Sequence, residues 1–260
     1  MSPVPLRPPV DPAWRVVVLS THFDDAALSL GGLLRATPGP KAVVTVHGGP
    51  PPPGSPLSSW DADCGFLAAE EAHRVRLAED ARACALLGAD QVVLDNPDNP
   101  YRAEGRLAGL TELLDALAPD VRVYLPLATN QPDHARVRDA ALAWFTTRSR
   151  PRPRPRVYAD LPYTAIVPGW AADPAAAIAG AADGTGAAYR ALAGAYGLTP
   201  VPGTRLPDDI WAGKRDAVLC YASQLSLVGA MDEVRGVGAL LSRSGPLRSE
   251  LTWELGPGPA

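Results

Sequence analysis

Short runs of β-branched and apolar residues alternate along most of the chain with stretches of helical periodicity. Such an alternation is typical of parallel strands joined by covering helices. The pattern predicts five strands, at Val16–Ser20, Ala42–His47, Gln91–Leu94, Val121–Leu125 and Val157–Ala159. It predicts helices over residues 24–36, 70–89, 107–118 and 134–147. We therefore expect an α/β fold with a Rossmann-like, doubly wound and mostly parallel sheet.

Three segments interrupt this alternation, and the two ends of the chain depart from it. Residues 48–66 are rich in Pro and Gly and form our candidate lid loop, residues 148–156 alternate Arg with Pro as a stiff connector, and residues 171–197 are an Ala/Gly-rich insertion. Residues 1–14 are expected to form an extended arm. At 260 residues, the rest fits one domain, 15–260, with a C-terminal elaboration.

Composition narrows the function classes. Lys and Arg number 24 against 28 Asp and Glu, with no basic face, which disfavours nucleic acid. No apolar run approaches the roughly 18 residues of a membrane span, and the Pro-rich beginning does not resemble a signal peptide. Three widely spaced cysteines without a CxxC pair favour a reduced setting. We expect a cytoplasmic protein that acts on a small molecule without membrane association.

Polar residues crowd the junction between the first predicted strand and its helix, in the sequence STHFDD. His22 and Asp25 can converge across this turn, and imidazole with carboxylate suits a divalent metal such as zinc. Asp24 would lie beside the metal without necessarily binding it. The alternative is structural: either aspartate caps the helix, and His22 is a hydrogen-bonded core residue.

A second polar cluster, TNQPDH, follows the fourth predicted strand and places Asp133 and His134 at the start of the next helix. The carboxyl ends of parallel strands share one edge of the sheet, where ligands bind. Two histidines and one aspartate from two strand ends make a three-ligand site with a position open for water, as in catalytic zinc sites. Capping alone explains this coincidence less well.

These residues resemble the PIG-L/LmbE-like superfamily of zinc-dependent N-deacetylases, whose two motifs are HPDD and HPDH. The segments RLAEDARACALLGA, LDNPDNPYR and KRDAVLCYASQ are also similar to that family, and the resemblance extends from Val16 to Gln224. It implies that His22, Asp25 and His134 are ligands of Zn²⁺, with Fe²⁺ or Co²⁺ as other candidates, and that Asp24 is the general base.

The sequence departs from the family motifs at two positions. Phe23 replaces a proline, which changes no chemical group. Gln131 replaces the first histidine of the second motif, which in the family is oriented by the residue equivalent to Asp133 and is thought to stabilise the oxyanion. A glutamine amide can donate a hydrogen bond but cannot supply a proton or a positive charge. His47, at the end of the second strand, is our candidate substitute, with burial under the Pro-rich loop as the alternative.

Other polar residues at the strand ends are weaker candidates. Asp98 and Arg102 are assigned to substrate binding, although turn formation also explains their segment, and Tyr163 is assigned likewise, with packing as its alternative. Asp160 also follows the fifth predicted strand and has the same two interpretations, a role in the site or packing. Arg76 and Asp80 are expected to form a helical i,i+4 pair, and His73 to be solvated.

The sequence therefore predicts a zinc-dependent hydrolase that removes an N-acyl group, in the first place acetyl, from an amino sugar or related metabolite, with secondary metabolism as a candidate setting. One alternative is an amidase that acts on a larger thiol-conjugate or natural-product amide. Another is a non-catalytic binding protein that keeps the fold. A phosphoesterase would need more carboxylates, and the GxGxxG pattern of dinucleotide sites is missing.

Overall fold

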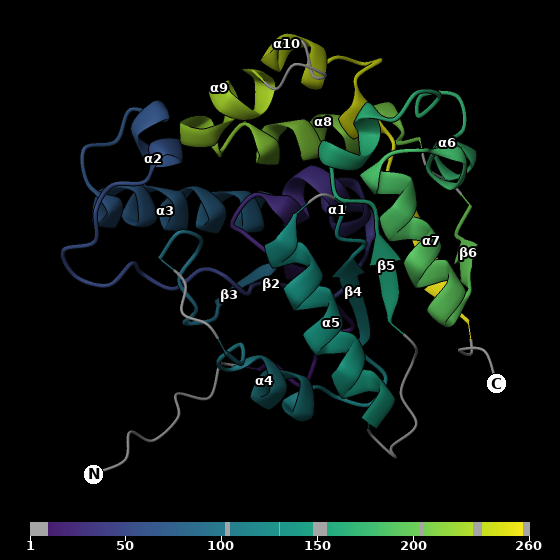
Figure 1. The fold of residues 1–260 in the computed structure, drawn as a ribbon, viewed down its shortest axis with the longest axis horizontal. Helices are drawn as coiled ribbons and strands as arrows, with labels where there is room; N and C mark the ends of the chain where they lie inside the picture. Colours follow the sequence, from purple (N-terminus) through teal and green to yellow (C-terminus); the bar gives the residue numbers. More distant parts are fainter. Residues whose placement is uncertain are drawn as a thin grey trace.

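The computed structural model describes residues 10–101, 105–129, 131–147, 155–202, 205–230 and 236–256. Their strands form one seven-stranded sheet in the order β3-β2-β1-β4-β5-β7-β6 (Figure 1). The strands are β1 Val16–Ser20, β2 Lys41–Thr45, β3 Asp90–Val93, β4 Arg122–Pro126, β5 Arg156–Tyr158, β6 Leu198–Pro200 and β7 Thr252–Leu255.

The first five strands are parallel and match the predicted strands within two residues at each end. All five residues of β1 and of β2 are buried, which is expected of a parallel sheet covered on both faces. The predicted α/β class and the doubly wound sheet are confirmed. The two last strands of the order pair antiparallel, β7 with β5 and β6 with β7.

Helices cover both faces of the sheet. On one face α1 (Asp25–Ala36) and α3 (Ala69–Leu87) pack with α8 (Asp208–Val218) and α9 (Ala222–Ala230), while α4 (Leu110–Ala116) and α5 (Pro132–Thr147) lie together on the other (Figure 1). The Ala/Gly-rich insertion forms α6 (Pro174–Gly180) and α7 (Gly184–Tyr196). The short helices α2 (Ser59–Asp63), α10 (Val237–Leu240), η1 (Tyr163–Ile166) and η2 (Pro246–Arg248) complete the described elements.

The N-terminal arm differs in part from the expectation. Trp14, the last residue of the predicted arm, is buried, and its indole N–H donates to Asp90 Oδ2 at 2.7 Å. Residues 1–9 of that arm and 148–154 of the connector lie outside the described residues. No described helix has the length and apolar character needed to cross a bilayer.

A buried ion pair fixes the middle of α1. Leu30 leaves helical geometry there, with φ −131° and ψ 17°. The backbone N–H groups of Gly32 and Leu33 donate to the two carboxylate oxygens of Glu250 at 2.7 and 2.8 Å, and Lys214 Nζ of α8 donates to the same carboxylate at 2.7 Å. Because every charge is paired and hydrogen-bonded, this pair can be buried without an orphaned group. It therefore ties α1, α8 and the C-terminal segment together.

A second buried carboxylate, Asp80 of α3, is not paired with Arg76 as the sequence suggested. It accepts hydrogen bonds from the Tyr221 hydroxyl and from Gln91 Nε2, both at 2.7 Å. No cation offsets its charge in these contacts. Burial therefore raises the pKa of Asp80 from 3.8 to about 6, against the two hydrogen bonds.

This shift predicts a pH-dependent stability. Between pH 3.8 and about 6 the folded state holds a proton on Asp80 that the unfolded state has lost, so this contribution is present below that window and is lost as the pH rises through it. The difference in unfolding free energy between Asp80→Asn and the wild type should shift in favour of the variant by about 1–3 kcal/mol from pH 4 to pH 8. Urea unfolding at several pH values measures it. Asp95→Asn, on an exposed residue, should show no such trend.

Candidate active site

The candidate residues lie where the order of the sheet reverses. From β1 the chain continues to β2 on one side, whereas β4, the neighbour on the other side, continues to β5 in the opposite direction. The loops that leave β1 and β4 therefore diverge and open a crevice at the carboxyl ends of the strands. His22, Asp24 and Asp25 follow β1, and Gln131, Asp133 and His134 follow β4. The two polar motifs thus meet at the switch point.

Backbone contacts shape the turn after β1. The Ser20 hydroxyl donates to the His22 carbonyl at 2.6 Å and accepts from Ala26 N–H at 2.9 Å. Asp25 Oδ2 accepts from the His22 backbone N–H at 2.8 Å. Asp24 stands at the N-cap position of α1, but its side chain makes no capping hydrogen bond. The capping alternative therefore does not explain Asp24.

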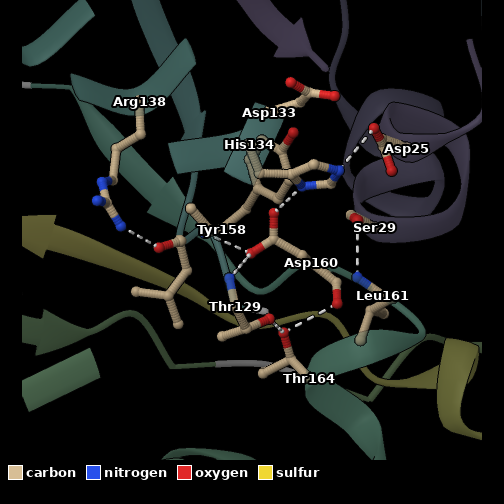
Figure 2. A network of polar contacts seen from close by, with 12 residues as sticks. Asp25, Ser29, Thr129, Asp133, His134, Arg138, Tyr158, Asp160, Leu161 and Thr164 are labelled. Atoms are coloured by element: carbon tan, nitrogen blue, oxygen red, sulfur yellow. Dashed lines mark hydrogen bonds and ion pairs between the residues drawn. The ribbon is translucent and has the colours of Figure 1, made fainter. Parts of the chain in front are cut away.

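His22, Asp25 and His134 converge on one point. The distance from Asp25 Oδ2 is 3.2 Å to His22 Nδ1 and 3.3 Å to His134 Nε2, and the three potential ligand atoms lie within 4.8 Å of one another. Asp25 and His134 are buried. His134 Nε2 is itself buried without a hydrogen-bond partner, while Nδ1 of the same ring contacts Asp160 (Figure 2). Two imidazole nitrogens and a carboxylate oxygen fit a zinc-type divalent cation.

Electrostatics at this point favour a cation. Burial opposes charge on His134, but the Asp25 carboxylate and the hydrogen bond with Asp160 raise the pKa of His134 to about 9. Burial likewise opposes ionisation of Asp25, yet the charge of His134 and the close contacts with both histidines hold the pKa of Asp25 well below its ordinary value. The carboxylates around the two rings thus create a site of negative potential.

Asp24 has a different environment from its neighbour. Burial first, and then the Asp25 carboxylate, raise the pKa of Asp24 from 3.8 to about 7. Its side chain lines the cavity beside His22. A carboxyl group with a pKa near neutrality is suited to both accepting and returning a proton.

A cavity of about 280 Å³ opens over these residues. His22, Asp24, Gln131, Asp133 and Tyr163 form its polar side. The cavity is also lined by residues of the candidate lid, residues 48–66, among them Trp60, which is 41% exposed, and by Gln224 and Val228 of α9. The lid loop therefore does border the site.

The lid is held by side chains that the sequence analysis placed elsewhere. Arg76 contacts Asp61 of α2 at 2.6 Å, and Tyr101 OH donates to Asp61 Oδ2 at 3.2 Å and accepts from Ser58 N–H at 2.9 Å. His73 was expected to be solvated, but it is half-buried, lies 2.8 Å from the Gly48 carbonyl through Nε2, and packs against Phe23. The helical period gave Arg76 and His73 a place on α3, but it could not show that a distant loop covers that face.

His47 lies in the site as predicted, with its ring centroid 6.1 Å from that of His22. Its Nδ1 is 3.1 Å from the Pro97 carbonyl oxygen. A carbonyl only accepts, so Nδ1 carries the proton and Nε2 presents a lone pair. Burial lowers the pKa of His47 to about 4, which keeps the ring neutral. These observations argue against His47 as the proton donor that would replace the missing histidine.

The remaining predicted residues have mixed positions. Asp98, expected to bind substrate, lies 3.1 Å from His22 Nε2 through Oδ1, and Asp133 Oδ2 lies 3.7 Å from the same nitrogen. Tyr163 lies edge-on to His134, with 6.0 Å between the ring centroids. Arg102 lies outside the described residues. Asp160, left open between site and packing, contacts His134 directly.

Comparison with known proteins agrees with this geometry. The sequence profile of the family described as PIG-L: GlcNAc-PI de-N-acetylase matches residues 17–145. These residues include both polar motifs. No curated protein sequence matches the chain.

Solved structures match over nearly the whole chain. The A40926 pseudoaglycone deacetylase Dbv21 is 26% identical, with a TM-score of 0.71 over 96% of this chain and 100% of that chain. A triple mutant of the deacetylase Orf2 from the teicoplanin biosynthetic pathway is 25% identical, with a TM-score of 0.69 over 93% of this chain and 97% of that chain. A deacetylase–teicoplanin complex, at 22% identity and a TM-score of 0.64 over 95% and 99% of the two chains, shares the fold.

The family profile and the deacetylase structures, together with the histidine–carboxylate cluster at the switch point of the sheet, identify an enzyme of the deacetylase class. Residues 17–145, which hold both polar motifs, belong to the PIG-L family.

The ion pair between Asp61 and Arg76 can be tested because Asp61→Asn should have opposite effects on the unfolding free energy in the presence and in the absence of Arg76. Both side chains are largely buried, at 4% and 11% exposure, so removing one partner leaves the other charge uncompensated. Asp61→Asn should lower the unfolding free energy of the wild type by about 1–3 kcal/mol. In an Arg76→Met background the same substitution should raise it, because it neutralises a stranded carboxylate.

Chemical denaturation of the four proteins measures this cycle. Arg76→Met also removes the contact with Phe66. Both proteins that carry Arg76→Met lack this contact, so its loss cancels when the effect of Asp61→Asn is compared within that background. Equal effects of Asp61→Asn in both backgrounds would show that the pair does not hold the lid.

Proposed function

We propose that this protein is a divalent-metal-dependent N-deacetylase that removes an acetyl group from an amino sugar carried by a natural product, in a secondary-metabolite pathway. The observation that carries the proposal is the convergence of His22, Asp25 and His134 on one point, where His22 and Asp24 line a cavity and Asp24 is not engaged in capping.

We assign the metal to His22, Asp25 and His134. When bound, a zinc-type ion supplies a Lewis acid that polarises the amide carbonyl and lowers the pKa of water. Three protein donors would leave at least one position of a bound ion for water or substrate, as in catalytic zinc sites. Zn²⁺ is our first choice, and Fe²⁺ and Co²⁺ suit the same nitrogen and oxygen donors.

Asp24 carries the proton transfers in this proposal. Its carboxylate takes a proton from the attacking water and then returns that proton to the nitrogen of the leaving amine as the C–N bond breaks. A pKa near 7 allows both steps at neutral pH. In this proposal Asp24 performs both proton transfers, because Gln131 stands where the family has a histidine and a glutamine amide cannot act as an acid.

Gln131 keeps part of the lost function. It lines the cavity at the start of α5, and its Nε2 can donate a hydrogen bond to the oxygen that becomes negative when water attacks the acyl carbon. Asp133, two residues further along the chain, lies beside His22, with its Oδ2 3.7 Å from His22 Nε2. His47 presents an acceptor nitrogen and is suited to hold a neighbouring N–H or O–H group.

The size of the cavity bears on the substrate. About 280 Å³ is at the lower end of small-molecule pockets, which suits an acetamido sugar rather than a whole glycosylated natural product. The scaffold that bears the sugar would then lie outside, near Trp60 and the lid. The A40926 pseudoaglycone and teicoplanin-pathway deacetylases among the structural relatives support this class of substrate.

Release of a free amine from an N-acetylglucosaminyl glycopeptide tests the proposal. Protein stripped with a chelator and reloaded with Zn²⁺ or Co²⁺ should release the amine, and the stripped protein should not. Asp24→Asn should lower kcat about 10²- to 10⁴-fold, the usual contribution of a general base, with no loss of metal affinity. Asp139→Asn, on a residue 63% exposed, is the matched control and should keep full activity.

Two results would contradict the proposal. One is a reloaded wild type that deacetylates no acetamido sugar, free or conjugated, which would favour a binding protein. The other is an Asp24→Asn variant as active as the control.

A further inference from the structure

Asp160 stands directly behind one of the assigned metal ligands. It follows β5, is 1% exposed, and its Oδ1 lies 2.6 Å from His134 Nδ1 (Figure 2). The other ring nitrogen, Nε2, faces Asp25. A histidine that binds a metal is neutral and carries one proton, so a hydrogen bond donated from Nδ1 leaves the lone pair on Nε2 for the ion.

The second carboxylate oxygen of Asp160 is fixed by the backbone. Oδ2 accepts from Ala128 N–H at 2.7 Å and from Thr129 N–H at 3.4 Å. The backbone carbonyl of Asp160 accepts from the backbone N–H and the hydroxyl of Thr164, at 2.8 and 2.9 Å. Protein groups therefore fix both the position and the rotation of the Asp160 carboxylate.

Ala128 has an unusual backbone conformation at this contact. Its φ is +66°, in the left-handed region that non-glycine residues rarely adopt. This turn directs two successive N–H groups toward one oxygen of Asp160. Disfavoured backbone persists where the surroundings hold it in place, and such residues cluster at functional sites.

We propose that Asp160 is a positioning residue that selects the metal-binding tautomer of His134. The inference rests on the proposed function, since it assumes that His134 binds the metal. Asp160 holds the proton of the ring on Nδ1, so that Nε2 is offered to the cation. The fixed backbone donors at Oδ2 ensure that Oδ1 is the atom that meets the ring.

Asp160→Asn reverses this selection while it keeps the shape of the side chain. The atom facing Ala128 and Thr129 must accept, so it has to be the amide oxygen. The amide nitrogen then faces His134 Nδ1 and donates to it, which moves the proton of the ring to Nε2. That proton occupies the lone pair that the metal needs.

His22 provides an internal comparison. Its Nε2 lies 3.1 Å from Asp98 Oδ1, so each histidine has a carboxylate on the ring nitrogen that is turned away from the shared point. The Asp98 side chain is 41% exposed, whereas that of Asp160 is 1% exposed. Water can replace the carboxylate of Asp98 but not that of Asp160. Loss of Asp98 should therefore affect metal binding less.

Competition of the full-length protein with a chromophoric chelator for Zn²⁺ measures the effect without using activity. Asp160→Asn should bind Zn²⁺ about 10- to 100-fold more weakly than the wild type, the usual effect of losing such a partner. Asp98→Asn should weaken Zn²⁺ binding by at most about threefold. Asp139→Asn, on a residue 63% exposed, is the control and should leave the affinity unchanged.

The wild type provides a second readout that needs no folded variant. Nitrogen-15 NMR of the zinc-loaded protein should show His134 protonated at Nδ1 and metal-bound through Nε2. Equal affinities of the wild type and Asp160→Asn, or a His134 ring protonated at Nε2 in the wild type, would overturn the inference about Asp160 alone. A wild type that binds no divalent ion would instead overturn the proposed function.

Discussion

The carboxylate of Asp25 draws two histidines from separate strand ends to one point, and the rest of the site is arranged around that contact. Its Oδ2 also accepts the His22 backbone N–H, so the turn after β1 and the first turn of α5 are tied through the same group. A buried carboxylate between two imidazoles is stable only when positive charge accompanies it. The fold thus builds a strong demand for a cation at the switch point of the sheet.

Rigid elements support that contact from behind. Asp160 fixes His134 from the end of β5, and the Glu250–Lys214 pair holds α1, whose first residue is Asp25. Both supports are buried and use backbone N–H groups as donors to a carboxylate. In contrast, the lid side of the cavity is held by side chains that contact the loop, among them Arg76, His73 and Tyr101. The proposed metal site is therefore built on the sheet and its helices, whereas the lid is a loop.

The sequence was informative where local pattern and tertiary structure agree. Parallel strands buried on both faces read as valine-rich runs, so β1 to β5 were predicted, and motifs at strand ends placed His22, Asp25 and His134. The antiparallel strands β6 (LTP) and β7 (TWEL) were missed because neither contains the valines that mark β1 to β5. Asp61 with Arg76, and Asp160 with His134, could not be paired from sequence, since these partners meet only after the fold has formed. The tautomer of His47 likewise depends on a carbonyl fifty residues away.

The central claim is that these side chains hold one divalent ion. Anomalous X-ray diffraction from crystals of the zinc-loaded protein, collected on both sides of the zinc absorption edge, tests it most directly. The account predicts one strong anomalous peak within bonding distance of His22, Asp25 and His134, with Asp24 beside the ion but not bound to it. A peak at another group of residues, or none at this cluster despite zinc bound in the crystal, would contradict the account.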